Sequence, residues 1–289
     1  MALLRCRASL RCTNFIGVVM ISNMEDQMDR DVNAGDDNGA ARPGAPALEK
    51  GLDLLEALAA EPGGINQKSL AARVGRSVGE IFRMLGVLER RGYVARDPKT
   101  GEYRLTLRLF QLGTQHPPTR RLQQAALPVM EGLAAQVGLA CHLSMASGGH
   151  FLILAQAEPD RPMGWTVKLG AVFPLSMHLV SARILTAFQR EPRRGEMVRA
   201  IAERDELPVD NILARLEGIA AAGHDLAPSE TAPGLTDMSA PVLDPSGLAV
   251  AALTLPFLPQ RGNTISQAEA LAALRDAAAR ISAQIGGPG

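Results

Sequence analysis

The side chains best suited to chemistry in this sequence lie along one short predicted helix, and the chemistry that they suggest is base recognition. Arg83 can bind a guanine edge with two hydrogen bonds or clamp a phosphate, and Phe82 can touch the methyl group of a thymine. Val78 and Gly79 lie one turn earlier, directly after Ser77. The alternative interpretations are an ordinary solvated arginine and a partly buried phenylalanine.

The helix that positions these residues is indicated by its start and by its spacing. Ser77 and Glu80 stand three residues apart, the spacing of a capping box in which each side chain bonds the backbone amide of the other residue. Three apolar residues then recur at helical spacing and define an inward face: Ile81, Leu85 and Leu88. Arg83 and Phe82 therefore face outward, together with the two residues that follow Ser77.

The segment before this helix completes a known arrangement. A first helix carries Leu70, Ala71 and Val74 on one face, and Gly75 supplies the turn that leads into the second helix. An earlier helix at about 48–60 presents a third apolar stripe. Two short helices joined by a tight glycine turn are typical of a helix-turn-helix, whose second helix enters the major groove of DNA.

A β-hairpin is predicted directly after the second helix. Its strands lie at 93–96 and 102–105, and the turn between them holds proline and glycine. A hairpin in this place is the wing of a winged helix, and Lys99 at its tip could reach a phosphate. Residues 46–115 carry eleven Lys and Arg against eight Asp and Glu, whereas residues 116–289 carry fourteen against sixteen. This basic excess favours a nucleic-acid partner, with a winged helix used for protein contacts as the alternative.

The sequence argues against a membrane protein and gives no support for an enzyme. No stretch approaches the roughly 18–20 apolar residues of a membrane span. The three cysteines (Cys6, Cys12 and Cys141) show no metal-ligand spacing, which fits a reducing cytoplasm. No nucleophile–base pair, metal-ligand set or phosphate-binding glycine loop is evident, so we expect no catalytic residue, metal or cofactor. An enzyme acting on a small molecule through its C-terminal domain remains the alternative.

The first 45 residues are expected to lie outside the folded domains. Arginines precede a short apolar run at 15–21, which resembles part of a signal peptide, but no small-residue cleavage site follows. Met24 offers an alternative start. We therefore favour a mis-assigned start or a disordered tail over secretion.

The remaining sequence predicts an α+β domain. We expect a winged helix-turn-helix domain at 46–115, a linker helix within 116–138 and a C-terminal domain at 139–289. In the last of these, strands are predicted at 141–146, 151–157, 164–169, 238–243 and 248–255, and helices at 180–190, 193–204, 208–222 and 266–285. Strands followed by helices and again by strands indicate an antiparallel sheet with helices packed on it.

Short motifs in both domains carry a family resemblance. Those of the N-terminal domain are Leu70-Ala71, Val74-Gly75, Ile81-Phe82-Arg83-Met84-Leu85, Leu88-Glu89 and Gly92-Tyr93-Val94. Those of the C-terminal domain are Gly170, Phe173-Pro174-Leu175, Pro233-Gly234-Leu235, Ser239-Ala240-Pro241-Val242 and Gly247 with Ala251-Ala252-Leu253-Thr254. In this order and spacing, from about residue 47 to residue 285, the chain resembles the IclR family of bacterial transcription regulators.

This resemblance implies a fold and a function. It implies a C-terminal effector domain of the GAF-like type, in which the sheet forms one wall of a small-molecule pocket. It also implies homodimers, often paired into homotetramers, on palindromic double-stranded DNA operators. The effectors of the family are commonly small organic or aromatic acids, so the expected function is a ligand-responsive transcription regulator.

The chain departs from the family pattern at three places. Family members often carry Lys-Ser-Thr where this chain has Val78-Gly79-Glu80, which bears on the operator sequence. The family's Thr-x-x-Gly-Lys corresponds here to the segment 179–183. Asp237 stands where some members have cysteine, and a carboxylate there suits a hydroxyl, amide or cationic group of a ligand.

The expected effector site combines a helix start with polar and apolar groups. The amides of Val180, Ser181 and Ala182 are expected to open a helix, where free N–H groups can hold an anion. The alternative for Ser181 is a plain N-cap. Asp237 and Thr254 are polar candidates, whose alternatives are a solvated loop and a satisfied strand hydroxyl. Apolar candidates for the walls, each with core packing as the alternative, are Trp165, Leu175 and Met145.

Overall fold

The computed structural model describes residues 45–115, 117–162, 164–259 and 265–288. These residues form two compact units that divide between Arg120 and Arg121. We call the described residues up to Arg120 the head and those from Arg121 the body. All of the expected N-terminal tail except Ala45 lies outside the described residues, including Met24, Cys6 and Cys12.

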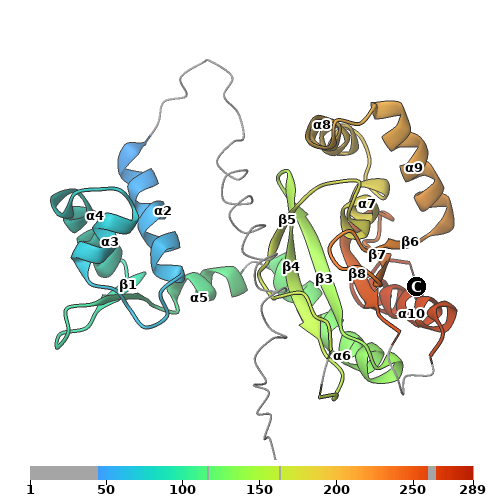
Figure 1. Ribbon diagram of the computed structural model, residues 1–289, viewed down its shortest axis with the longest axis horizontal. Helices are drawn as coiled ribbons and strands as arrows, with labels where there is room; N and C mark the ends of the chain where they lie inside the picture. The colour runs from blue at the N-terminus through green and yellow to red at the C-terminus, as the bar shows by residue number, and fades with distance from the viewer. Residues whose placement is uncertain (1–44, 116, 163, 260–264, 289) are drawn as a thin grey trace, which may run out of the picture. The chain divides into compact units, whose positions relative to one another are not determined.

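The head consists of a three-helix core and a hairpin (Figure 1). Its elements are α2 (Pro46–Ala59), α3 (Gln67–Arg73), α4 (Val78–Arg90), β1 (Val94–Arg96), β2 (Tyr103–Leu105) and α5 (Arg108–Thr114). The apolar stripes of the first three helices meet in one core, in which Leu54, Leu70 and Leu85 are fully buried. The predicted winged helix-turn-helix is confirmed. The short helix α5 was not expected, because it has no side-chain cap at its start.

Local signals account for the ends of the two helices of the helix-turn-helix. The Asn66 side chain accepts a hydrogen bond from the Ser69 amide and so begins α3. Gly75 and Gly92, which follow α3 and α4, have φ of 61° and 76°. Other residues rarely adopt this left-handed conformation, so glycine at these two positions lets the chain turn sharply.

The body is built on one antiparallel sheet of six strands in the order β5-β4-β3-β8-β7-β6. The strands are β3 (Cys141–Ser147), β4 (His150–Ala157), β5 (Val172–Pro174), β6 (Asp225–Pro228), β7 (Thr236–Leu243) and β8 (Ala249–Phe257). The two predicted hairpins, β3–β4 and β7–β8, are therefore confirmed and lie side by side at the centre of the sheet.

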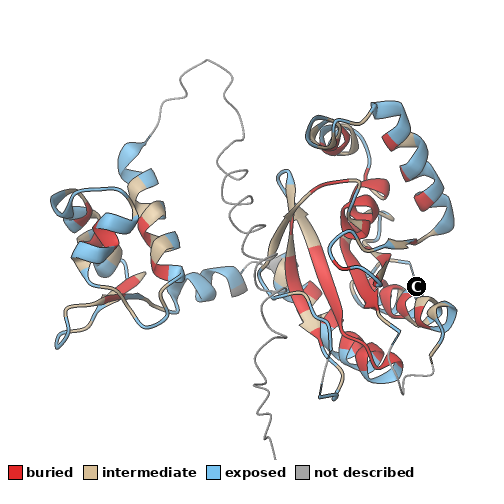
Figure 2. Ribbon diagram, viewed as in Figure 1, coloured by how far each residue is buried: buried red, intermediate tan, exposed pale blue. Residues whose placement is uncertain are grey.

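Helices cover both faces of this sheet, as the prediction of an α+β domain required (Figure 1). The helices are α6 (Pro117–Val137), α7 (Val180–Ala187), α8 (Arg193–Asp205), α9 (Val209–Ala222) and α10 (Gln267–Gln284). Side chains of α6 and α10 share one core with the sheet, whereas α7, α8 and α9 form a second core with it. All eight residues of α7 are buried, and Figure 2 shows this helix and the central strands as the most buried part of the body.

Two details of the body differ from the prediction. Residues 164–169, which include Trp165, form no strand, and the strand after β4 is the short β5 instead. Pro162, Gly164 and the left-handed Gly170 (φ 81°) interrupt the chain around the expected strand. The edge strand β6 was not expected, since its four residues follow a helix without a hairpin turn. In the part of the chain that the structure describes, no helix is long and apolar enough to cross a membrane.

Candidate functional site

The first candidate site is the outer face of α4. Ile81 and Leu85 are buried in the head core, and this fixes the opposite face of the helix toward solvent. Val78, Phe82 and Arg83 are exposed there, with 58% of the Phe82 residue surface accessible. Arg83 makes no ion pair or hydrogen bond with another described residue, so its guanidinium is available for a partner.

The start of α4 is held by the predicted capping box. Ser77 accepts a hydrogen bond from the Glu80 amide at 3.3 Å, and Glu80 accepts one from the Ser77 amide at 3.0 Å. The Ser77 hydroxyl also donates to Glu80, so this hydroxyl is occupied inside the protein. Gly79 is exposed in the first turn of the helix. Ser77 therefore serves first as a cap, and its amide and hydroxyl are less available to DNA than its position suggested.

The wing tip is formed by a turn closed on Asp97. This carboxylate accepts hydrogen bonds from the amides of Lys99 and Thr100, and these bonds lower the pKa of Asp97 below 3.8. The Lys99 side chain is exposed at the tip, as predicted. A rigid turn with an exposed ammonium is suited to a phosphate contact.

Glu80 also joins α4 to α2 through an ion pair with Lys50 at 2.9 Å. The hydrogen bond from Lys50, followed by the bonds from Ser77, lowers the pKa of Glu80 from 4.5 to about 2. Because the folded-state pKa lies below the unfolded value, Glu80 stabilises the head above pH 4.5, and this contribution disappears as the pH falls toward 2.

Glu80→Gln is therefore expected to lower the melting temperature of the head at pH 7, with a difference from wild type that shrinks below pH 4.5. The measurement is thermal unfolding followed by tyrosine fluorescence, since both tyrosines, Tyr93 and Tyr103, lie in the head. Glu89→Gln on the same helix is the control for loss of charge alone. An equal decrease in melting temperature in the two variants would contradict the stabilising role of Glu80 in the capping box and the ion pair with Lys50.

The second candidate site lies in the body, on the sheet face that α7 covers. The strand register places five polar residues directly opposite one another across five strands, and we call them the polar row: Gln156, His142, Thr254, Ser239 and Asp225. Residues paired across antiparallel strands point to the same face of a sheet. The polar row is therefore a continuous hydrophilic line across five of the six strands.

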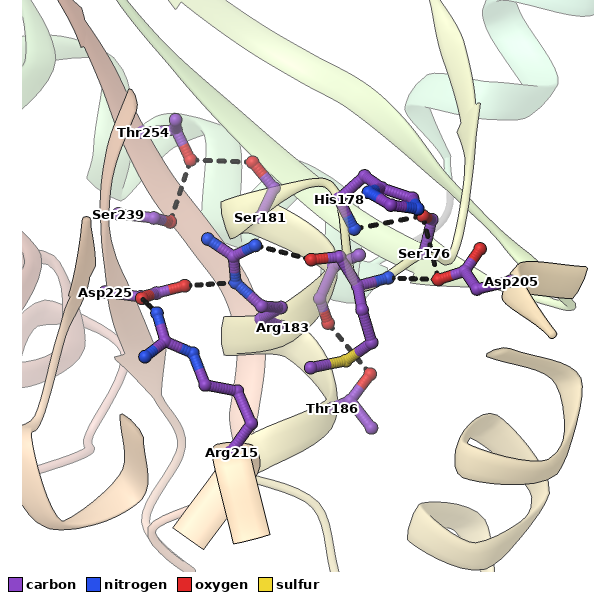
Figure 3. Close-up of polar contacts among 12 residues, drawn as sticks. Ser176, His178, Ser181, Arg183, Thr186, Asp205, Arg215, Asp225, Ser239 and Thr254 are labelled. Carbon is purple, nitrogen blue, oxygen red and sulfur yellow. Dashed lines mark hydrogen bonds and ion pairs between the residues drawn. The ribbon is translucent and has the colours of Figure 1, made fainter. Parts of the chain in front are cut away.

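Helix α7 contacts the centre of the polar row through Ser181. The hydroxyls of Ser181 and Thr254 share a hydrogen bond of 2.8 Å, and Thr254 shares another of 2.8 Å with Ser239 (Figure 3). All three residues are at least 95% buried. A predicted pair, the start of α7 and Thr254, is thus brought together by the fold.

Arg183 lies over the end of the polar row at Asp225. Its Nε donates to Asp225 and its Nη1 donates to the carbonyl oxygen of Met177, while Arg215 donates to the other Asp225 oxygen at 3.1 Å (Figure 3). Both Arg183 and Asp225 are more than 90% buried. The remaining nitrogen, Nη2 of Arg183, is buried and has no hydrogen-bond partner among the described residues.

A pocket of about 280 Å³ opens on the α9 side of Arg183. It is lined by residues of α7, α9 and the segments before them: Met177, His178, Arg183, Leu207, Asn211, Ile212 and Arg215. The two arginines of this pocket are the two that bind Asp225, so the pocket and the polar row share a wall.

Two titratable side chains near the polar row have shifted pKa values. Burial raises the pKa of Asp237 above 3.8, and a hydrogen bond from Ser229 and the charge of Arg183 offset only part of this effect. Burial lowers the pKa of His142 from 6.5 to about 4, so the imidazole is neutral at pH 7. The site thus combines a fixed cation, a neutral ring and a carboxylate that ionises less readily than usual.

The amides that were predicted to hold an anion lie at the start of α7. Leu179 is the N-cap residue, so the alternative role of Ser181 as a plain N-cap is wrong. Val180, Ser181 and Ala182 occupy the first turn of the helix and are buried. Their location near Thr254 agrees with the prediction, while their role as ligand contacts remains a prediction.

The three apolar candidates lie apart from the hydroxyls. Leu175 is 1% exposed within the core formed with α7, α8 and α9, and Met145 packs against the core on the opposite face of the sheet. The structure favours core packing for both. Trp165 lies outside any strand and is 41% exposed.

Several residues of the site were not predicted from the sequence. Arg183 was noted only within a departure from a family motif and Ser239 only within a family motif, whereas His142, Asp225 and Gln156 were not named as site candidates. For the residues that lie on strands, the signal in the sequence that could have identified them is a polar residue within an otherwise apolar stretch. Among the described residues, no group of three or more His, Cys, Asp and Glu could hold a metal ion. Burial raises the pKa of the Cys141 thiol to about 12, so it is not a thiolate.

Two family models match this chain, one in each part. Residues 118–283 match the family described as "Bacterial transcriptional regulator IclR C-terminal", and residues 47–98 match the "IclR helix-turn-helix domain". The HTH-type transcriptional repressor AllR of Salmonella typhimurium is 25% identical over 255 residues, which cover 85% of this chain and 92% of that protein. The HTH-type transcriptional regulator KdgR of Escherichia coli is 26% identical over 241 residues, covering 82% and 91%.

A solved structure shares the fold. It is an IclR homolog from Microbacterium hydrocarbonoxydans in complex with 4-hydroxybenzoate, at a TM-score of 0.67 and 20% identity, covering 83% of this chain and 98% of that one.

Proposed function

The chain belongs to the IclR family of bacterial transcriptional regulators, and we propose that it controls transcription from a palindromic operator in response to a small organic molecule. The helix-turn-helix domain binds DNA, and the C-terminal domain is the effector domain of the family. The observation that carries the DNA-binding role is the outer face of α4, where Arg83 is exposed and free of other described partners.

The division of labour follows the units of the structure. Residues 46–115 bind DNA, 116–138 form the linker helix and 139–289 bind the effector. The contacts to the operator come from Val78, Gly79, Phe82 and Arg83 on α4 and from Lys99 on the wing, while Ser77 caps the helix that presents them. The relatives are named as regulators, which supports a cytoplasmic DNA-binding role without catalysis.

The protein acts as a homodimer or homotetramer. A palindrome presents two half-sites about 34 Å apart, and one head can occupy only one of them. Light scattering is expected to give a multiple of the 30.6 kDa chain mass, and gel-shift titrations to give specific binding that weakens steeply with salt. A stable monomer that binds operator DNA one chain per site would contradict this assembly.

The effector binds between α7 and the sheet. The supporting observation is the convergence of Ser181, Thr254, Arg183 and Asp237, a few polar groups within an apolar body. The IclR homolog that binds 4-hydroxybenzoate supports a small organic acid as the effector. Val180 and Ala182 complete the helix start, and Trp165 lies in the segment after β4. Leu175 and Met145 pack in the hydrophobic cores on the two faces of the sheet.

Asp237→Ala is expected to blunt the effect of the ligand on operator affinity while leaving ligand-free DNA binding close to wild type. Coupling between two such sites is typically about 1–3 kcal/mol, which corresponds to a roughly 5- to 150-fold change in operator affinity when the ligand binds wild type. Asp237→Ala should lose most of this ligand-induced change. The probes are small organic acids, amides and phenols, first screened for thermal stabilisation of the whole protein and then added to gel shifts. Asp276→Ala on the exposed face of α10 is the control. A wild-type response in Asp237→Ala would show that the effector site lies elsewhere.

A further inference from the structure

The outward face of α4 is mainly apolar. Val78, Phe82 and Val87 are exposed there, at 44%, 58% and 43% of their residue surfaces. Between residues 78 and 87, Arg83 is the only exposed residue whose side chain can form a hydrogen bond. The base edges in a major groove offer hydrogen-bonding groups and one apolar group, the C5-methyl of thymine. An apolar face on a DNA-reading helix is complementary to that methyl group.

Two glycines frame Phe82 and Arg83 on this face. Phe82 and Arg83 follow Gly79 by three and four residues, and Gly86 follows it by seven, so all four share one side of the helix. A glycine within a helix destabilises it relative to alanine. Beyond the adjacent helix backbone, a Cβ at Gly79 would have no described atom within 4 Å, and a Cβ at Gly86 only the end of the Arg90 side chain at 3.7 Å. The head therefore has room for alanine at both positions and does not itself require glycine.

The partner that requires the bare backbone is the major groove. The match to the IclR helix-turn-helix domain covers residues 47–98, and α4 is the second helix of that motif. The second helix of a helix-turn-helix enters the major groove. Glycine lets a backbone approach a ligand more closely than any other residue allows. Two glycines in the middle of the outward face therefore let α4 lie close to the base edges, where the Phe82 ring is within reach of a methyl group.

We propose, on the basis of the operator binding proposed above, that Phe82 is a specificity-determining residue that reads the C5-methyl group of a thymine. Gly79 and Gly86 hold no side chain that would keep the ring away from the bases. Because Phe82 and Arg83 are adjacent on α4, the A·T pair that carries this methyl group neighbours the G·C pair that Arg83 binds. Each operator half-site then contains a thymine methyl that is required for recognition.

The first experiment removes the methyl group from the DNA. Duplexes that bind the full-length protein are enriched from a random pool, and each thymine of the enriched half-site is then replaced by deoxyuridine. This change deletes the methyl and leaves every hydrogen-bonding group in place. At one thymine position, the replacement is expected to weaken binding by roughly fourfold for one half-site and about 15-fold for both, the value of burying one methyl group in each. Gel-shift titration measures the change.

The second experiment removes the ring from the protein. Phe82→Ala is expected to bind the thymine and deoxyuridine duplexes alike, because the group that senses the methyl is gone. Phe110→Ala on α5 is the matched control, since Phe110 is 70% exposed and lies outside the helix-turn-helix. This control should keep the wild-type ratio between the two duplexes. Should Phe82→Ala fail to fold, the deoxyuridine series on wild type still decides the proposal.

The third experiment separates stability from binding. Gly86→Ala is expected to raise the melting temperature of the head by about 4–8 °C, since alanine favours the helix interior. The same change should weaken operator binding by about tenfold or more, because the added Cβ overpacks a close interface. Gly51→Ala on α2 is the matched control: a Cβ there also has no described atom within 4 Å. It should raise the melting temperature and leave operator binding unchanged.

Three results would overturn the proposal while leaving operator binding intact. They are wild-type affinity for every deoxyuridine duplex, a preference for thymine that persists in Phe82→Ala, and operator binding by Gly86→Ala as tight as that of wild type. If the full-length protein enriches no duplex from the pool, the proposed function itself fails and this proposal fails with it.

Discussion

Asp225→Ala is expected to destabilise the body by about 3–5 kcal/mol, the largest effect among single changes in the site. Asp225 is 4% exposed and accepts from both Arg183 and Arg215. Removing one partner of a buried ion pair leaves the other charge buried without compensation, and this penalty exceeds the value of the pair itself. Urea unfolding followed by the fluorescence of Trp165, the only tryptophan, measures it.

The matched control for this prediction is Arg215→Ala. The Arg215 side chain is 54% exposed, and pairs with such exposed groups contribute at most about 1 kcal/mol. The Arg183–Asp225 pair stays intact in this variant. If Asp225→Ala lowers the free energy of unfolding no more than Arg215→Ala does, the buried Arg183–Asp225 pair does not stabilise the packing of α7 on β6.

Arg83→Ala is expected to weaken specific operator binding by about 2–6 kcal/mol for a dimer. Each bidentate pairing of an arginine with a guanine is worth about 1–3 kcal/mol, and the substitution removes one such pairing from each half-site of a palindrome. The fold of the head should be unaffected, because Arg83 is exposed and bonds no other described polar group. Gel-shift titration on the operator and on a scrambled duplex separates specific from general binding.

Lys99→Ala distinguishes base recognition from general attraction. If Lys99 at the wing tip binds a phosphate, its replacement should weaken binding to all sequences alike and reduce the salt slope by about one for each phosphate that it neutralised. Arg83→Ala should instead lower the ratio of specific to scrambled binding. An unchanged operator preference in Arg83→Ala would remove this residue from the recognition surface.

The features that could be predicted from the sequence are those encoded within a few residues. Ser77 and Glu80 define the start of α4 by themselves, and Gly75 and Gly92 mark its flanking turns. Alternation and turn residues likewise identified the two central hairpins of the body. Each of these signals acts between residues close in sequence, so no knowledge of the tertiary fold is required.

The polar row could not be predicted in the same way. His142 and Thr254 meet only because β3 pairs with β8, more than a hundred residues later, and no local pattern sets that register. The same holds for Arg183 and Asp225, which α7 and β6 bring together. The strand predicted at 164–169, with Trp165, was wrong for a related reason. The edge strand next to β4 is the three-residue β5, and no local pattern shows which segment pairs there.

The two outermost strands of the body also bear on how copies of this chain can associate. β5 and β6 have three and four residues, whereas the four strands between them have seven to nine. Both end in proline, Pro174 and Pro228, which has no N–H to offer to a neighbouring strand. Short, proline-ended margins resist pairing with a strand of another chain. Subunits of an oligomer are therefore expected to join through their helices and loops, leaving each six-stranded sheet separate.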